Sequence, residues 1–161
     1  MAESRQHIEL VDSLGRWVRN NSFLGDDPIV YLDSPDSSAQ DMPYTLNGHR
    51  PDVFARSSVS ERQIIAEAKT PSDLGTRRSL VQIKGFLNVV QERPDCAFVI
   101  ATRWDHVRDA SSTILRLCNE IGFSHAKYGV IDDADFFSWL EINAKCLISR
   151  DNQALRHAIQ V

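Results

Sequence analysis

The chain has few cysteines, no long hydrophobic run and no excess of positive charge. Three cysteines in 161 residues, Cys96, Cys118 and Cys146, are scattered and odd in number, so we expect reduced thiols rather than a disulfide framework. The longest apolar runs are far shorter than a bilayer span, and no charged-then-apolar leader opens the chain. These absences predict a cytoplasmic protein with no membrane partner.

Several motifs that identify common classes of enzyme are also missing. The histidines and cysteines do not follow zinc-ligand spacings, and there is no Gly-rich phosphate loop, G-x-S-x-G elbow or dinucleotide fingerprint. The net charge of -4 argues against nucleic-acid binding over the whole surface but permits a local basic site. Basic residues do gather in the segments discussed below: Arg50, Lys69, Arg77, Arg78, Lys84 and Arg103.

What is present is the composition of one ordinary globular domain. Hydrophobic residues make up 42% of the chain and charged residues 25%, and the length suits a single domain over residues 1–161. Periodicity and turn signals then predict the elements. The expected helices cover residues 4–19, 76–91, 104–122 and 132–145. The expected strands cover residues 29–32, 44–46, 49–55, 63–69, 97–102 and 127–131. This order predicts an α/β fold, a three-layer sandwich with a central mixed β-sheet flanked by helices.

Two short stretches carry the acids of interest. Asn47-Gly48 is a strong hairpin signal, and it places Asp52 just inside the second strand of that hairpin, after Pro51. In the stretch of residues 63–69, alternation puts Glu67 and Lys69 on one face, roughly 7 Å apart. Asp52 can also be explained as a turn acid, and Glu67 with Lys69 as a surface ion pair. The apolar neighbours of Glu67 favour a buried central strand, where acids and lysines are rare unless paired or functional.

This set of groups suits a divalent cation. Two carboxylates, Asp52 and Glu67, and the Ala68 carbonyl between Glu67 and Lys69 are hard oxygen ligands of the kind that Mg²⁺ prefers. Lys69 is placed to orient a water or to stabilise charge on a phosphate. We therefore expect a site for Mg²⁺ (or Mn²⁺).

The pattern resembles the PD-(D/E)XK nuclease superfamily, which has the restriction-endonuclease-like fold. Pro51-Asp52 matches the "PD", Glu67-Ala68-Lys69 matches the "EXK", and Gln82 with Phe86 matches a glutamine-x-x-x-aromatic helix found in several branches. Phenylalanine stands where tyrosine is commoner. The resemblance covers about half of the chain, and its specificity lies in the order of these motifs together.

The resemblance implies a role for each of these residues. Asp52, Glu67, Lys69 and Gln82 would be catalytic, with Asp52, Glu67 and the Ala68 carbonyl as metal ligands. The first helix of the family often adds an acid, and the helical projection puts Glu3, with His7 one turn later, on the apolar face. His7 can equally be a boundary residue, and Glu3 can fray at the terminus. Phosphate contacts are expected from Arg77, Arg78 and Lys84, the first two near a helix N-terminus.

The function implied is hydrolysis of phosphodiester bonds, in a DNA endonuclease of repair, mobile-element or defence processes. A homodimer or larger nuclease complex is expected because one such centre cuts one strand, and residues 147–161 are a candidate docking or dimerisation tail. Two alternatives remain. The protein is a catalytically idle nucleic-acid-binding or scaffold subunit of the same fold, or the motif is coincidental and the domain binds a protein partner.

Overall fold

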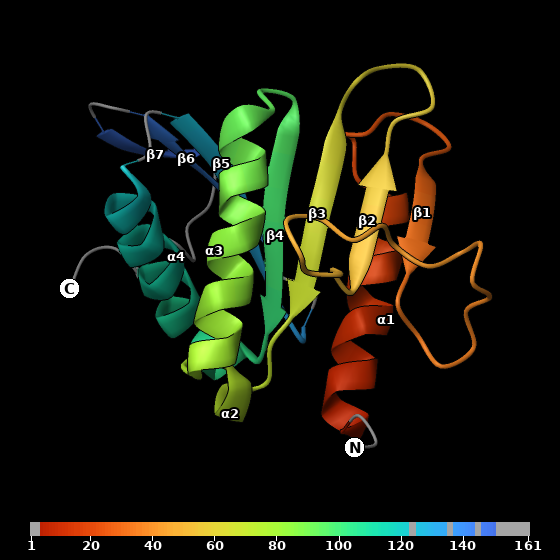
Figure 1. The fold of residues 1–161 in the computed structure, drawn as a ribbon, viewed down its shortest axis with the longest axis horizontal. Helices are drawn as coiled ribbons and strands as arrows, with labels where there is room; N and C mark the ends of the chain where they lie inside the picture. Colours follow the sequence, from red (N-terminus) through yellow and green to blue (C-terminus); the bar gives the residue numbers. More distant parts are fainter. Residues whose placement is uncertain (1–3, 123–124, 135–136, 144–145, 151–161) are drawn as a thin grey trace.

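The computed structural model describes residues 4–122, 125–134, 137–143 and 146–150. Its strands form one mixed sheet, and their spatial order follows the chain from β1 to β7 (Figure 1). Neighbouring strands are antiparallel except for the two parallel pairs β3–β4 and β4–β5. The strands are β1 (Ile29–Leu32), β2 (Val53–Arg56), β3 (Gln63–Ala68), β4 (Cys96–Thr102), β5 (His125–Asp132), β6 (Phe137–Asn143) and β7 (Cys146–Arg150).

Helices cover both faces of this sheet. α1 (Arg5–Arg19) packs on one face, while α3 (Arg77–Glu92) and α4 (Val107–Ile121) pack on the other (Figure 1). Two short elements, α2 (Pro71–Leu74) and the 3-10 helix η1 (Trp104–His106), follow the ends of β3 and β4. The expected α/β sandwich with a mixed sheet between layers of helices is therefore confirmed.

β3 shows how the sequence builds the three layers. Ile64 and Ala66 join the core between the sheet and α1, together with Leu14. Ile65 points the other way and packs in the core with Phe86 of α3. Because side chains alternate along a strand, and both faces of β3 are covered, the strand is apolar on both sides. The predicted central position of this strand is confirmed.

Capping signals give the ends of the long helices. The Ser4 hydroxyl accepts a hydrogen bond from the His7 amide at 3.2 Å, and the Thr76 hydroxyl accepts one from the Ser79 amide at 3.2 Å. These contacts satisfy amide groups that the first turn of a helix leaves unpaired. α4 ends at Gly122, which adopts a left-handed conformation with φ 73° and ψ 45°. The predicted starts of α1 and α3 and the predicted end of α4 are confirmed.

The helix predicted over residues 132–145 is wrong. Within that range the structure has strand β6, which pairs with β5 so that Ile131 lies opposite Phe137. A short run such as Phe136-Phe137-Ser138-Trp139-Leu140 fits either period, because it is too short for periodicity to separate a helix from a strand. Antiparallel pairing with β5, the strand directly before it, decides between them.

The predicted hairpin is correct in its turn and wrong in its strands. Asn47 and Gly48 both have positive φ, 49° and 80°, as a tight hairpin turn requires. Only an isolated bridge between Leu46 and His49 flanks that turn, and β2 begins at Val53 rather than at His49. Pro51 has no amide hydrogen to donate to a ladder. Residues 49–52 therefore approach the sheet without joining it.

None of the helices in the described ranges has the length and apolar content to cross a bilayer. Of the tail predicted at residues 147–161, residues 147–150 belong to β7, and residues 151–161 lie outside the described part of the chain.

Two glycines offer a test of the α4 terminus. Gly122→Ala should lower the free energy of unfolding by about 1 kcal/mol, because alanine is strained at a φ of 73°. Gly75→Ala is the matched control, since Gly75 has a φ of -96° and no atom lies within 4 Å of a Cβ built there. Urea denaturation of both variants measures the difference, and equal effects would contradict the left-handed cap.

Candidate functional site

Asp52 and Glu67 meet where β2 begins and β3 ends. The antiparallel register pairs Val53 with Ala66, so the residues just outside this pair, Asp52 and Glu67, face each other across the two strands. The Asp52 amide donates to Glu67 Oε2 at 3.2 Å, and the Ala68 amide donates to Asp52 Oδ2 at 2.7 Å. Each carboxylate is therefore held by a main-chain N–H of the opposite strand.

Lys69 links this pair of acids to α3. Its Nζ donates to Glu67 Oε1 at 2.8 Å and to Gln82 Oε1 at 2.8 Å. The Gln82 amide nitrogen in turn donates to the Arg50 carbonyl at 3.4 Å. Lys69 follows β3 directly, and its own amide donates to the Ala101 carbonyl of β4 at 2.9 Å. The ammonium group is thus fixed between a strand end and the first turns of α3.

His7 of α1 completes one side of the site. Its Nε2 lies 3.4 Å from Asp52 Oδ1, and its side chain is 16% exposed. The helical projection predicts that His7 lies on the apolar face of this helix, and it leaves open whether His7 is a boundary residue. The structure brings it to the acids. Glu3, the acid predicted one turn earlier, lies outside the described residues.

Asp33 is a site residue that the sequence analysis did not propose. It follows the last residue of β1, and its amide donates to the Asp52 carbonyl at 2.8 Å. Burial raises the pKa of the Asp33 carboxyl, while the charge of Arg50 opposes that rise. The available signal was its position directly after an apolar strand; the Ser- and Asp-rich loop that follows concealed it.

Burial and the nearby Asp52 make the ionised form of Glu67 unfavourable. Glu67 is only 2% exposed, and burial, with the charge of Asp52 as a second cause, raises its pKa to about 8. Lys69 opposes this rise by charge and by its hydrogen bond, but one ammonium does not offset both burial and a second carboxylate. A cation placed between the acids would relieve this repulsion.

These groups line a polar cavity of about 480 Å³. Its wall combines residues from α1, the strand ends and the N-terminal half of α3. Of the residues predicted for the site, it contains Asp52, Glu67, Lys69, Arg78 and Gln82.

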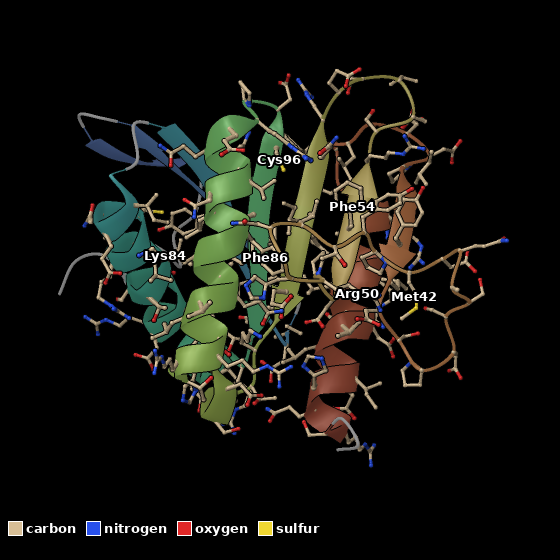
Figure 2. The ribbon with its side chains drawn as sticks, viewed as in Figure 1. Met42, Arg50, Phe54, Lys84, Phe86 and Cys96 are labelled. Atoms are coloured by element: carbon tan, nitrogen blue, oxygen red, sulfur yellow. The ribbon has the colours of Figure 1, made fainter. Side chains whose placement is uncertain are left out.

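Two predicted phosphate ligands are not brought to this cavity. Arg77 is exposed but does not line it. Lys84 lies 3.7 Å from Glu120 of α4, and Figure 2 shows it on the side of α3 away from Arg50. On a helix, residues one or two positions apart face different directions, so Arg77 and Lys84 diverge from Arg78 and Gln82.

The carboxylate oxygens of Asp52 and Glu67 are suitable ligands for a hard divalent cation, but they also contact other groups of the protein. Each oxygen of Asp52 and Glu67 already has one protein partner: His7 Nε2, the Ala68 amide, Lys69 Nζ or the Asp52 amide. A carboxylate oxygen has two lone pairs, so each retains one for a metal. Within the described residues, no cluster of three or more His, Cys, Asp or Glu side chains has the spacing of a metal site. Any cation would therefore need main-chain oxygen, such as the Ala68 carbonyl, and water to complete its coordination.

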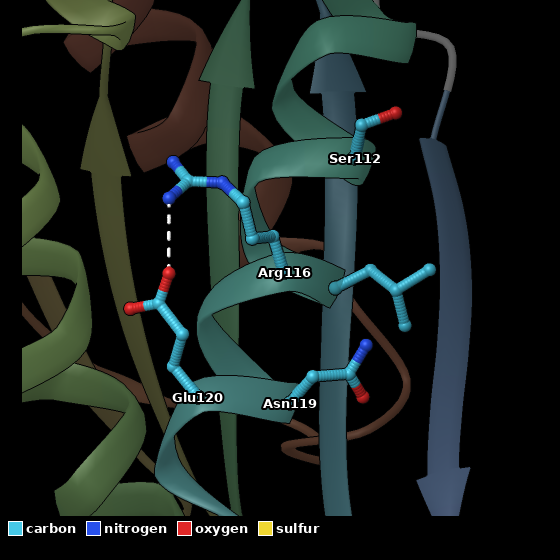
Figure 3. Close-up of a pocket in the computed structure, with 5 residues that line it drawn as sticks. Ser112, Arg116, Asn119 and Glu120 are labelled. Atoms are coloured by element: carbon cyan, nitrogen blue, oxygen red, sulfur yellow. Dashed lines mark hydrogen bonds and ion pairs between the residues drawn. The ribbon is translucent and has the colours of Figure 1, made fainter.

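A hollow of similar size, about 490 Å³, lies on the outer surface of α4 (Figure 3). Its polar residues Arg116 and Glu120 are hydrogen-bonded to each other at 3.0 Å. This hollow contains none of Asp52, Glu67 and Lys69. The cavity between α1, the strand ends and α3 is therefore the better candidate for a functional site.

Comparison with known proteins gives short matches. A stretch of 33 residues is 64% identical to the 3-dehydroquinate synthases of Shewanella pealeana and Shewanella halifaxensis, and 34 residues are 65% identical to that of Idiomarina loihiensis. These matches cover 20% or 21% of this chain and only 9% or 10% of the length of each relative. No family model matches the chain, and no solved structure does. The short matches assign no family to it.

The raised pKa of Glu67 predicts how stability depends on pH. In the native state the carboxyl stays protonated up to about pH 8, whereas in the unfolded chain it ionises near its ordinary value of 4.5. The native state therefore binds more protons between these two values, and stability falls as the pH rises through that window. Each unit of pKa difference corresponds to about 1.4 kcal/mol.

We expect Glu67→Gln to remove this fall. In a chelating buffer, the free energy of unfolding of the wild type should drop by more than about 1 kcal/mol relative to Glu67→Gln between pH 5 and pH 8. Urea denaturation at several pH values measures both curves. Parallel curves across that window would contradict the assignment of a buried, repelled Glu67.

Proposed function

We propose that the protein is a metal-dependent nuclease of the restriction-endonuclease-like fold that hydrolyses phosphodiester bonds in DNA. The observation that supports this best is the buried set of Asp52, Glu67 and Lys69 at the ends of β2 and β3 in a mixed sheet. Both acids are fixed by main-chain amides, and the lysine is fixed by an acid and a glutamine. Buried ionisable groups that converge in a cavity are typical of functional sites.

Each residue then has a defined task. Asp52, Glu67 and the Ala68 carbonyl would hold Mg²⁺ or Mn²⁺, which when bound lowers the pKa of a water ligand and polarises a phosphate. Lys69 has three N–H donors, and Glu67 and Gln82 occupy two of them. The third is available to a phosphate oxygen or to the attacking water. Gln82 and Glu67 keep that ammonium from turning away from the cavity.

One observation favours the alternative of a catalytically idle, nucleic-acid-binding subunit. Three of the four carboxylate oxygens of the central acids already accept hydrogen bonds from the protein, and His7 Nε2 lies 3.4 Å from the fourth. A site that works only with a bound ligand does not need this many internal contacts. The two functions differ in turnover and not in DNA binding. The third possibility, a protein-binding domain, predicts neither.

Metal binding should be visible in the melting temperature. At a concentration of 100 times the dissociation constant, Mg²⁺ or Mn²⁺ should stabilise the protein by about 2.7 kcal/mol, a shift of several degrees. Asp52→Asn should abolish the shift, because it removes a charged ligand but keeps an acceptor for the Ala68 amide. Asp36→Ala, at an exposed acid of the nearby loop, is the control that should leave the shift intact. An equal shift in all three proteins would place the metal elsewhere.

Cleavage of labelled linear, circular and branched DNA tests the reaction itself. With Mg²⁺ or Mn²⁺ we expect cutting that falls on the order of 10²-fold or more in Glu67→Gln and in Lys69→Met. Lys84→Met is a matched control, since Lys84 pairs with Glu120 outside the cavity. Circular substrates that are cut show endonuclease action. Equal cutting by wild type and all variants would mean contamination, and DNA binding without any cutting would favour the idle subunit.

A further inference from the structure

A second polar cavity, of about 400 Å³, adjoins the first. The two cavities share four lining residues: Asp33, Arg50, Arg78 and Gln82. The second cavity extends from these residues to the turn at Gly48 and His49. Its volume is within the range of small-molecule binding sites, so it can hold a group the size of a sugar phosphate.

The far wall of this second cavity is fixed against α3. Asn47 donates its side-chain amide to the Gly85 carbonyl at 3.3 Å, and the His49 ring lies edge-on to Phe86 at 6.2 Å. A Cβ at Gly85 would lie 2.9 Å from His49 Cδ2, so the turn approaches the helix as closely as it does only because residue 85 is glycine. The cavity is therefore built by tertiary contacts.

Within the described part of the chain, neither of its two guanidinium groups forms an ion pair, although the charge of Arg50 acts on the Asp33 carboxyl. Arg50 contacts the Met42 sulfur at 3.9 Å, and a thioether is a weak acceptor. Arg78 makes no hydrogen bond or ion pair with the residues that the structure describes. By contrast, Arg5 and Arg116 on the outer helix surfaces are each paired with a glutamate at i+4. Asp33 is the acid in the lining of the second cavity, and the charge of Arg50 stabilises its carboxylate against burial.

Gln82 connects the two cavities through its own hydrogen bonds. Its carbonyl oxygen accepts from Lys69 Nζ, and its nitrogen donates to the Arg50 main chain. Gln82 is therefore the shared wall, with the proposed catalytic lysine on one side and the main chain of a cavity arginine on the other. A ligand with two acceptor groups can occupy both cavities at once, and successive phosphates of a nucleic acid strand are such groups.

We propose that the second cavity binds the phosphodiester group next to the scissile one in the same nucleic acid strand, with Arg50 and Arg78 as its ligands. This inference rests on the proposed nuclease function. Guanidinium groups bind phosphate through paired N–H donors, and such contacts fix the register of a strand without reading its sequence. The enzyme would then select for a strand with an intact neighbouring phosphate and not for a base.

Binding is measured first, by fluorescence anisotropy of a labelled branched DNA in a chelating buffer, where no cutting occurs. Arg50→Ala and Arg78→Ala should each weaken binding about 3- to 10-fold and reduce the salt dependence by about one phosphate contact. Arg77→Ala is the matched control, since it removes the same charge from the same helical turn but from outside both cavities. Its effect should stay below about 2-fold.

The identity of the bound group is tested by neutral methylphosphonate linkages, placed one at a time along the cleaved strand. One linkage adjacent to the cut should slow the wild type and Arg77→Ala about 10-fold, while the Arg50→Ala/Arg78→Ala double variant should be insensitive to it. Gly85→Ala, which displaces His49 but keeps both arginines, should reduce the sensitivity part-way.

The outcomes separate this inference from the function on which it rests. Cutting by the wild type with equal sensitivity to the neutral linkage in all variants would overturn the second phosphate site and leave the nuclease intact. Equal loss of binding in Arg77→Ala and Arg78→Ala would also overturn it, because the effect would be general charge. A wild type that neither binds nor cuts DNA would overturn both.

Discussion

The register of β2 against β3 is the constraint on which the site depends. Because Val53 pairs with Ala66, the side chains of Asp52 and Glu67 face each other, and the amide of each strand reaches the acid of the other. A slip of one residue would turn Glu67 to the opposite face of the sheet. The hydrophobic residues on both faces of β3 oppose such a slip, because it would move the Ile64 and Ile65 side chains to the opposite faces of the sheet and out of the cores in which they pack. The packing of the sheet thus fixes the positions of the two acids at the ends of these strands.

That arrangement buries an ionisable group, which is unfavourable for its charged form. Glu67 is almost fully buried beside a second acid, and its raised pKa expresses the cost. Lys69 reduces the repulsion but is itself held by Gln82, so the compensation depends on α3 as well as on the strands. Folding alone is served better by apolar residues of similar volume at such positions. This cost supports the proposal that these residues serve a function other than folding.

α3 packs one side against the sheet and lines both cavities with another. Ile83, Phe86 and Leu87 are buried against the sheet. Arg78 and Gln82, four residues apart on one face, reach the cavities, while Lys84 pairs with α4. Gly85 allows the turn at His49 to pack closely on the helix and so forms the far wall of the second cavity. The helix that holds the lysine in place therefore also lines both cavities, through Arg78 and Gln82, which couples their geometry.

The amino-acid sequence is sufficient to predict the features that depend on neighbouring residues. Caps at Ser4 and Thr76, the left-handed end at Gly122, the turn at Asn47-Gly48 and the shared face of Glu67 and Lys69 all follow from local conformational preference or from strand alternation. The remaining features depend on tertiary packing. Strand β6 in place of a helix, and the presence of His7 and Asp33 beside Asp52, depend on which segments meet and in what register. The contacts of His7 and Asp33 with Asp52 join residues far apart in the chain, and no local period encodes them.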